Sequence, residues 1–246
     1  MSTFKLCAII PTLNHYKVLN KVVGEVRNFD IPVIIVDDGS DFVAADVIDK
    51  IGTENTEITV LRHSTNMGKG AAFLTGLEHA KASGFTHALQ IDADGQHDLN
   101  DLPKLITSAT NAPQCLVTAK PVYDSSMPLG RKIGRWFTHV WVWVETLSFK
   151  ITDSMCGYRI YPIEPTLSVI SEEKVGQRMD FDTSVMVRLF WRGIPVLEIP
   201  SKVIYPEENT SNFDVVKDNI LITRMHTRLV FGMLFRLLTF KIWSKA

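Results

Sequence analysis

The sequence has few of the features that mark secreted, zinc-binding or nucleic-acid-binding proteins. Its 246 residues include three cysteines, which lie far apart at Cys7, Cys115 and Cys156 and form no CxxC or Cys/His cluster. This argues against a zinc site and is typical of a reducing compartment. The net charge is −1 and the pI about 6.7, so there is no overall basic field to attract nucleic acid.

Two further absences concern membranes. The chain starts almost directly on an apolar strand, without the basic leader and apolar core of a secretory signal. No run of about 20 apolar residues free of charge occurs, so we expect no membrane-spanning helix. The length suits one large α/β domain with a well-covered core.

Apolar runs alternate with helical segments in the first half of the chain. The runs predict buried strands near residues 5–10, 31–36, 57–62, 86–91 and 114–119. Helices of about 10–15 residues between such strands predict an α/β fold with a parallel, doubly wound sheet. The less regular second half predicts a long loop over 121–132, helices over 133–149 and 183–192, and strands near 157–161 and 195–205.

The helix expected over 133–149 has an unusually aromatic stripe. Core packing is the main interpretation of such a stripe, and the breadth of tryptophan leaves a lipid-facing role as the alternative. The stripe consists of Trp136, Val140, Trp143 and Leu147, with Phe137, Trp141 and Val144 beside them.

Polar residues follow three of the expected strands. Asn14 follows the first, Asp37 and Asp38 the second, and Asp92 and Asp94 follow the strand near 86–91. Ligands of α/β sheets bind at the carboxyl ends of strands, and two carboxylates one residue apart suit a divalent cation and its phosphates. Each cluster alone is also explained as a turn that caps the next helix. Their convergence on one sheet edge favours a nucleotide site.

A glycine-rich segment, Gly68-Lys69-Gly70, opens the helix that follows the third strand. It matches neither a Walker loop nor a dinucleotide fingerprint. Free N–H groups at such a helix start can still hold an anion, and Lys69 adds a positive charge.

The C-terminal tail is basic, aromatic and short. Its apolar part after Arg228 has about 15 residues, or roughly 22 Å of helix, which is less than the ~30 Å hydrocarbon layer. Basic residues among aromatics predict a helix lying in the membrane interface, and a helix docked on the domain or in a dimer seam is the alternative. These basic residues are Arg224, Arg228, Arg236 and Lys241.

Five motifs, taken together and in order, resemble the family 2 glycosyltransferases with a GT-A fold. Within that family the chain is most similar to the polyprenyl-phosphate-mannosyltransferase-like members, over about residues 5–205. The motifs are Ile10-Pro-Thr-Leu-Asn14, Val36-Asp-Asp-Gly-Ser40, Asn66-Met-Gly-Lys-Gly70, Asp92-Ala-Asp-Gly-Gln-His97 and Asp153-Ser-Met-Cys-Gly-Tyr-Arg159.

The resemblance implies a donor site on the first half of the chain. Asp94, with Asp92, would carry Mg²⁺ or Mn²⁺, and Gln96 and His97 would flank the donor diphosphate. The nucleotide itself would contact Pro11, Asn14, Asp38 and Lys69, with Asp37 in support and Asp92 at the end of the base site.

The resemblance places the acceptor on the second half. Asp153, Gly157 and Arg159 would lie on a segment that closes over the diphosphate and the acceptor, where Arg159 would neutralise developing charge. Asp180 and Asp182 are candidates for a base that takes a proton from an acceptor hydroxyl. A lipid-phosphate acceptor is already an anion and needs no base, so both aspartates would then be structural.

The expected protein is therefore an inverting glycosyltransferase that moves a sugar from a nucleotide-diphosphate sugar to a lipid-linked or membrane-associated acceptor. A single GT-A-type domain would span 1–213, with a nucleotide-binding half (1–120) and an acceptor half (121–213), followed by an amphipathic helical tail (214–246). It would be cytoplasmic and peripheral on the inner face of the membrane, through the tail helix. No nucleic-acid partner is expected, and a homodimer stays open.

The sequence departs from the family pattern at some positions, and two other classes of protein are alternatives. Asp98 and Leu99 stand where polyprenyl-phosphate enzymes commonly have prolines, and the absence of Gln-x-x-Arg-Trp argues against a processive polymerase. A haloacid-dehalogenase-like phosphatase would need the Asp-x-Asp motif on its first strand and Thr or Val in place of Gln96. A non-catalytic nucleotide-sugar-binding module docking on a membrane biosynthetic complex remains the alternative.

Overall fold

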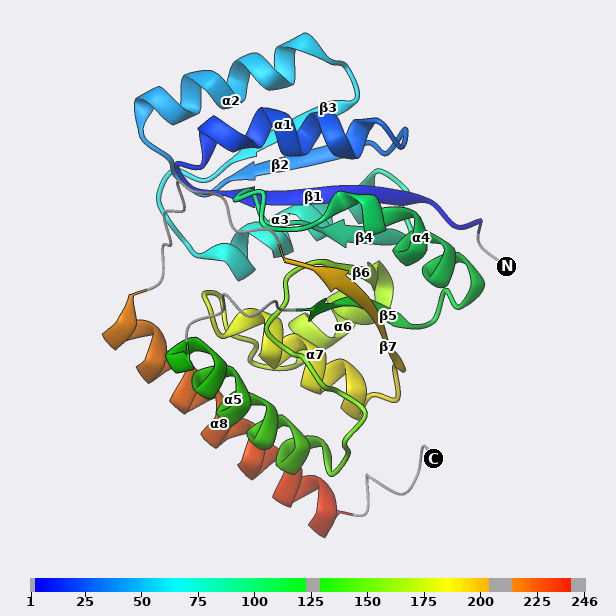
Figure 1. Cartoon of the computed structure of the whole chain (residues 1–246), viewed down its shortest axis with the longest axis vertical. Coiled ribbons are helices and arrows are strands. Elements are labelled where there is room, and N and C mark those ends of the chain that lie inside the picture. Colours follow the sequence, from blue (N-terminus) through cyan, green and yellow to red (C-terminus); the bar gives the residue numbers. More distant parts are fainter. Residues whose placement is uncertain (1–2, 123–128, 204–213, 240–246) are drawn as a thin grey trace.

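In the part of the chain that this computed structural model describes, residues 3–122, 129–203 and 214–239, seven strands form one sheet (Figure 1). The strands are β1 (Leu6–Thr12), β2 (Val33–Asp37), β3 (Ile58–Arg62), β4 (His87–Gln90), β5 (Leu116–Val122), β6 (Arg159–Pro162) and β7 (Val196–Lys202). Their spatial order is β3-β2-β1-β4-β6-β5-β7. β6 runs antiparallel to both of its neighbours, while the other pairs are parallel, so the predicted mostly parallel α/β sheet is confirmed.

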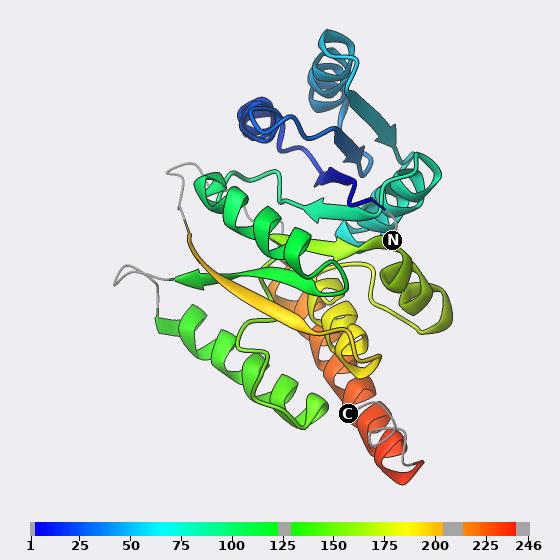
Figure 2. The same ribbon diagram turned by 90° about the vertical axis from the view of Figure 1, so that its right-hand side faces the viewer.

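Helices cover both faces of the sheet (Figure 2). They are α1 (Tyr16–Arg27), α2 (Phe42–Glu54), α3 (Lys69–Ala82), the 3₁₀ turn η1 (Leu99–Asp101), α4 (Leu102–Asn111), α5 (Leu129–Thr146), α6 (Ile163–Glu172), α7 (Phe181–Trp191) and α8 (Val215–Leu238). Alternate residues of β1 serve the two cores, because successive side chains of a strand point to opposite faces. Ala8 and Ile10 pack with α1, α2 and α4, whereas Cys7 and Ile9 pack with α3 and α7.

The second half differs most from the sequence-based prediction. Helix α6 was not predicted. Its Pro165 lies in the first turn, where proline is tolerated. Helix α5 begins at Leu129, inside the loop predicted over 121–132, and residues 123–128 of that loop lie outside the described part. No helix among the described residues has the length and apolar character needed to cross a bilayer.

The core interpretation of the aromatic stripe on α5 is wrong. Trp136 and Phe137 are each 55% exposed and Trp141 is 47% exposed. The buried side of this helix is instead formed around Val142, with polar residues that have their own hydrogen-bond partners. Thr138 and Thr146 bond to main-chain carbonyls of the preceding turn, and Glu145 bonds to His226 of α8.

The strand order brings the expected polar clusters to one edge of the sheet. β2, β1 and β4 are neighbours and parallel, so their carboxyl ends meet at the same edge. The antiparallel β6 begins at that edge, because Arg159 pairs in register with Gln90 near the end of β4. The segments that carry residues 14, 37–38, 92–94 and 153–159 therefore converge.

Candidate active site

Asp37 and Asp38, at the end of β2, are both fully engaged with protein groups. Asp38 accepts hydrogen bonds from the main-chain N–H groups of Met67 (2.9 Å) and Gly68 (2.7 Å) and lies 2.8 Å from His63 Nδ1. Asp37 accepts from Arg62 Nε at 2.6 Å and from the N–H of Ser40 at 2.9 Å. In this conformation Asp38 thus shapes the turn that leads into α3.

Gly68 shows why that turn needs a glycine. Its φ of 106° lies in a region that side chains rarely adopt, and a Cβ atom there would lie 2.3 Å from the carbonyl oxygen of Gln177. The same carbonyl accepts a hydrogen bond of 2.8 Å from the N–H of Gly70. The start of α3 is therefore held closely against the segment that precedes α7.

Asn14 and Pro11 lie at the end of β1. Asn14 has a φ of 60° and is tied to the start of α2, because its side chain accepts from the N–H of Asp41 and its own N–H donates to Ser40, both at 2.9 Å. Pro11 is buried and lies in register with Val36 of β2. Both residues are at the sheet edge where the donor nucleotide was expected.

Lys69 is the centre of a charged cluster built from three elements. Its ammonium lies 2.7 Å from Asp92 Oδ1, after β4, and donates a hydrogen bond of 2.8 Å to Asp182 Oδ2, on α7. The other oxygen of Asp182 accepts from Gln90 Nε2 at 2.9 Å. Burial opposes the charge of Lys69, but Asp182 and Asp92 outweigh it and raise the pKa of Lys69.

The turn after β4 holds the two motif carboxylates in different surroundings. Burial opposes ionisation of Asp92, yet Lys69 and His97 hold the pKa of Asp92 well below its usual range. His97 Nε2 lies 3.3 Å from Asp92 Oδ2, and its ring stacks on Tyr158. Asp94 accepts a hydrogen bond of 3.0 Å from the N–H of Gln96, while burial and the nearby charge of Asp92 raise the pKa of Asp94.

Gly157 passes directly over the Lys69–Asp92 pair. A Cβ atom on Gly157 would lie 2.6 Å from Lys69 Nζ and 2.9 Å from both oxygens of Asp92. Only a residue without a side chain fits this position while the pair stays in place.

Arg159 has a different environment from the one expected. The residue is fully buried, and its guanidinium donates to the main-chain oxygens of Asp182 (2.7 Å) and Ser154 (2.6 Å) and to the hydroxyl of Tyr161 (3.2 Å). In this conformation Arg159 joins the 153–159 segment to the start of α7, while Lys69 is the cation paired with Asp92 among the described residues.

Asp153 and Asp180 stand apart from the Lys69 cluster in their contacts. Asp153 accepts from the N–H groups of Met155 and Cys156 and pairs with Arg135 of α5. Asp180 accepts a 3.2 Å hydrogen bond from the N–H of Arg178 just before α7.

Several residues of this region were missed at the sequence level. Arg135 and His139 stand one turn apart on α5 and face Asp153, with His139 Nε2 at 3.8 Å. Their i, i+4 spacing, which places both side chains on one face of a helix, was the available signal. Glu198 of β7 accepts from the N–H groups of Thr152 and Asp153, and no sequence pattern pointed to it.

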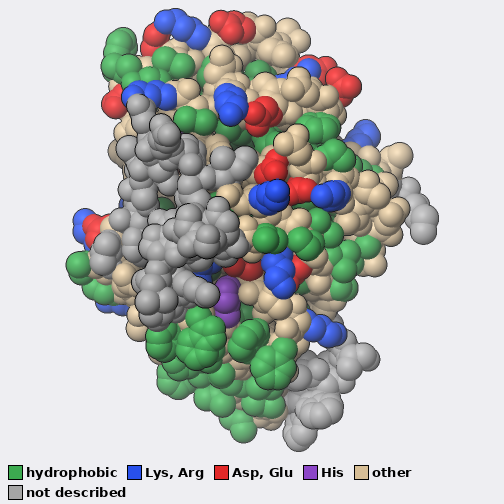
Figure 3. All heavy atoms as spheres, in the orientation of Figure 1, with side chains coloured by type: hydrophobic (Ala, Val, Ile, Leu, Met, Phe, Trp, Pro, Cys, Tyr) green, Lys and Arg blue, Asp and Glu red, His purple; other side chains and the backbone are tan. Residues whose placement is uncertain are grey.

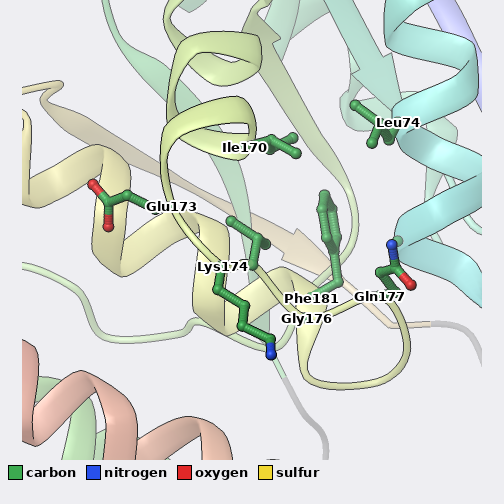
Figure 4. Close-up of a pocket in the computed structure, with 9 residues that line it drawn as sticks. Leu74, Ile170, Glu173, Lys174, Gly176, Gln177 and Phe181 are labelled. Carbon is green, nitrogen blue, oxygen red and sulfur yellow. The ribbon is translucent and has the colours of Figure 1, made fainter.

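A pocket of about 230 Å³ lies between α3, α6 and the segment before α7 (Figure 4). Leu74, Ile170 and Phe181 supply its apolar walls, and Glu173 and Lys174 stand at its side. None of the predicted site residues lines it. Among the described residues, no group of three or more His, Cys, Asp or Glu is arranged to hold a metal ion by itself.

Comparisons with known proteins define the class of this chain. The sequence model of glycosyl transferase family 2 matches residues 7–177, so the chain belongs to that family and is a glycosyltransferase. Family membership also rules out the phosphatase alternative.

Two curated relatives agree with the resemblance to polyprenyl-phosphate enzymes. One, from Methanococcus voltae, is a UDP-N-acetylglucosamine–dolichyl-phosphate N-acetylglucosaminyltransferase; it is 27% identical over 216 residues, which cover 81% of this chain and 85% of the relative. The other, from Micrococcus luteus, is an undecaprenyl-phosphate mannosyltransferase, 25% identical over 201 residues, which cover 80% and 82% of the two chains.

A solved structure supports the fold. A mannosyltransferase from Pyrobaculum calidifontis, in complex with GDP-Man and Mn²⁺, matches with a TM-score of 0.60 and 14% identity, over 96% of this chain and 66% of that chain. The predicted GT-A-type fold is thereby confirmed.

Proposed function

We propose that this glycosyltransferase moves a sugar from a nucleotide-diphosphate sugar to a polyprenyl phosphate, with inversion at the anomeric carbon. The observation that carries the proposal is the Asp92–Asp94 turn at the carboxyl end of β4, beside the Lys69 ammonium. Both curated relatives are named for transfer to a polyprenyl phosphate, which supports this acceptor class.

A divalent cation fits the turn after β4. Mg²⁺ and similar ions are often bound by one or two carboxylates together with substrate phosphates. Asp94, with Asp92, would hold the cation. The described residues contain no larger group of metal ligands, so oxygens of the donor's diphosphate would complete the coordination. Burial and, after it, the neighbouring charge of Asp92 raise the pKa of Asp94, and both effects would be offset by a bound cation. A bound cation would neutralise the charge of the leaving nucleoside diphosphate.

The surroundings of Asp182 favour an anionic acceptor. One of its oxygens accepts from Lys69 and the other from Gln90, so it is occupied as a counterion. A hydroxyl acceptor needs a base to take its proton, whereas an oxygen of a lipid phosphate already carries negative charge. In the proposed reaction that oxygen bonds to the anomeric carbon as the bond to the donor's diphosphate breaks.

Basic side chains near Asp153 offer a place for the acceptor phosphate, with Arg135 and Lys120 as the cations; burial lowers the pKa of His139, which would serve as a neutral hydrogen-bonding group. Arg135 and His139 reach this segment from α5, and Lys120 of β5 lies 3.9 Å from Glu198. Asp153 and Glu198 hold these groups in position. The acceptor side of the site would then lie between α5 and the Gly157 segment, next to Lys69 and Asp92.

The proposal also sets the reaction at a membrane, since polyprenyl phosphates are membrane lipids. The protein would be peripheral on the cytoplasmic face and contact lipid through α8, as its basic and aromatic composition predicts. A homodimer is compatible with this arrangement.

Transfer of labelled sugar onto purified undecaprenyl phosphate tests the proposed function. The assay supplies UDP-, GDP-, CDP- and dTDP-sugars in turn, with Mn²⁺ or with EDTA, and compares undecaprenyl phosphate with undecaprenol. We expect product from one nucleotide class, only with the phosphate acceptor and only with the cation. Product with undecaprenol alone, or in the presence of EDTA, would overturn the proposal.

A further inference from the structure

Helices α5 and α8 carry their acidic residues inward. Over residues 129–146 and 215–238 the sequence contains only two carboxylates, Glu145 and Asp218. Glu145 is 0% and Asp218 5% exposed. Arg224 and Arg228 of α8, by contrast, are exposed. The outer sides of both helices are therefore without carboxylates.

Large apolar side chains occupy those outer sides. In the space-filling view a green patch covers the lower part of the molecule, over α5 (Figure 3). The exposed apolar residues are Trp136, Phe137, Trp141 and Val144 on α5 and Val216, Ile220, Phe231, Leu234, Phe235, Leu237 and Leu238 on α8. Together with Arg224 and Arg228 they are called the two-helix surface below.

The two helices form one layer on the domain. Both pack on α7 and on each other, and they lie side by side in both ribbon views (Figures 1 and 2). Glu145 Oε1 and His226 Nδ1 lie 2.6 Å apart at the seam, where the ring of Trp141 also approaches His226. Because each helix turns its buried side towards α7, the exposed sides of both helices face away from the domain.

We propose that the two-helix surface binds a membrane that contains anionic phospholipid, with α5 and α8 lying along the bilayer plane. The inference deepens the proposed function and rests on it for the lipid nature of the acceptor. It differs from the sequence-based expectation in that α5, and not the tail alone, contacts the membrane. Tryptophan and phenylalanine suit the boundary between headgroups and acyl chains, and arginine suits the anionic headgroups.

Charge complementarity favours a membrane over a second copy of this chain. In a two-fold dimer the same patch meets itself, so each residue of the patch faces another residue of that same patch. Arg224 and Arg228 would then meet another basic surface with no exposed carboxylate of these helices to pair with. Like charges facing each other disfavour association. An anionic membrane supplies the missing charge.

The position of α5 links this surface to the active site. Trp136, 55% exposed, follows directly after Arg135, which pairs with Asp153. A membrane on the two-helix surface would therefore lie about one helical turn from the segment where we place the acceptor phosphate. A polyprenyl phosphate could reach the site while its chain remains in the lipid.

Vesicle co-sedimentation of the full chain tests the inference. The vesicles consist of phosphatidylcholine alone or mixed with phosphatidylglycerol, without polyprenyl phosphate or nucleotide. We expect binding to the anionic vesicles, and roughly tenfold or greater weakening for Trp136→Ala/Phe137→Ala on α5 and for Arg224→Glu/Arg228→Glu on α8. Two matched controls lie on other helices and should bind as the wild type does. Phe42→Ala/Val43→Ala on α2 removes exposed apolar side chains, and Lys21→Glu/Lys50→Glu on α1 and α2 reverses two exposed charges.

The outcomes separate this inference from the proposed function, because no substrate is present. Wild-type protein that stays in the supernatant, or an α5 double variant that sediments like the wild type, would overturn it. So would a wild-type dimer in light scattering that becomes a monomer in the α5 variant, because a second copy would then cover the surface. Unfolding curves of each variant confirm that it is folded. A loss of transfer activity alone would bear on the proposed function and not on vesicle binding.

Discussion

Lys69 and Asp182, 113 residues apart in the sequence, share a hydrogen-bonded ion pair of 2.8 Å. The same ammonium group lies 2.7 Å from Asp92, so one lysine joins the start of α3, the end of β4 and the start of α7. Gln90 completes the cluster through its bond to Asp182. Segments from the first and second halves of the chain are thus held together by charge at the proposed reaction centre.

Replacing Lys69 with methionine should destabilise the protein in a pH-dependent way. Removing one partner of a buried ion pair leaves uncompensated charge, and we expect a loss of about 3 kcal/mol in the free energy of unfolding at pH 7. This is at the low end of the usual range, because the Lys69 side chain is 21% exposed. Urea unfolding of the wild type and of Lys69→Met measures this loss.

The direction of the pH effect follows from Asp92. In the folded wild type the pKa of Asp92 lies below the ordinary aspartate value. The ionised carboxylate therefore stabilises the folded protein at any pH above that ordinary value, and this stabilisation is lost as the pH falls through the pKa of the folded state. In Lys69→Met, Asp92 loses the ammonium that lowers its pKa, so it should instead take up a proton as the pH falls from 7 to 4. The difference in the free energy of unfolding between the wild type and Lys69→Met should therefore become smaller as the pH falls from 7 to 4. A difference that stays constant over this range would contradict the account.

Lys81→Met is the control, because Lys81 forms an exposed ion pair with Glu164. This substitution should lower the free energy of unfolding by less than about 1 kcal/mol.

A methyl group at position 157 should damage the site. In Gly157→Ala the new Cβ would collide with Lys69 Nζ and both oxygens of Asp92, so the ion pair must shift. We expect transfer to fall at least roughly 100-fold, since small misplacements of reacting groups cost that much. Transfer assays at saturating donor measure the loss.

Gly24→Ala is the matched control for this substitution. Gly24 lies within α1, and a Cβ there would meet no atom within 4 Å. The variant should keep full activity and gain about 0.5–1 kcal/mol of stability, because alanine is the better helix residue. Equal activity of the two alanine variants would refute the close approach of Gly157 to the ion pair.

Asp182→Asn distinguishes a counterion from a general base. As a counterion Asp182 should be replaceable at a stability cost of about 1–3 kcal/mol, since Lys69 keeps Asp92 as a partner. We expect the folded variant to retain more than about a tenth of wild-type transfer to a lipid phosphate, whereas loss of a general base costs roughly 10²–10⁴-fold. A loss of that size, together with a changed pH–rate profile, would restore Asp182 as the base.

Local patterns predicted the first half of the fold well. The buried apolar runs of β1 and β2 and the polar residues at their ends are encoded within a few residues of each other, so the sheet edge with Asn14, Asp38 and Asp94 followed from the sequence. Strand direction is not encoded in this way. The antiparallel course of β6 follows from its pairing with β4 and β5, which are distant in sequence.

The surroundings of individual site residues could not be predicted either, because they depend on contacts between segments that are distant in the sequence. The contact of Lys69 with Asp182 and the burial of Arg159 against main-chain carbonyls depend on how α7 packs, which no local pattern specifies. The aromatic stripe on α5 shows a second limit. Periodicity identified an apolar face, but only the tertiary structure shows that Trp136 and Phe137 lie outside the core.

Thermal unfolding with nucleoside diphosphates tests the central claim, a cation-dependent donor site at the Asp92–Asp94 turn. UDP, GDP, CDP and dTDP are each added with and without Mn²⁺, to the wild type and to Asp94→Asn. At about 100 times its dissociation constant a ligand adds roughly 2.7 kcal/mol, which raises the melting temperature by several degrees. We predict such a shift with one nucleotide, only with Mn²⁺, and none in Asp94→Asn despite near wild-type stability without ligand. No shift with any nucleotide, or an equal shift in Asp94→Asn, would contradict the account.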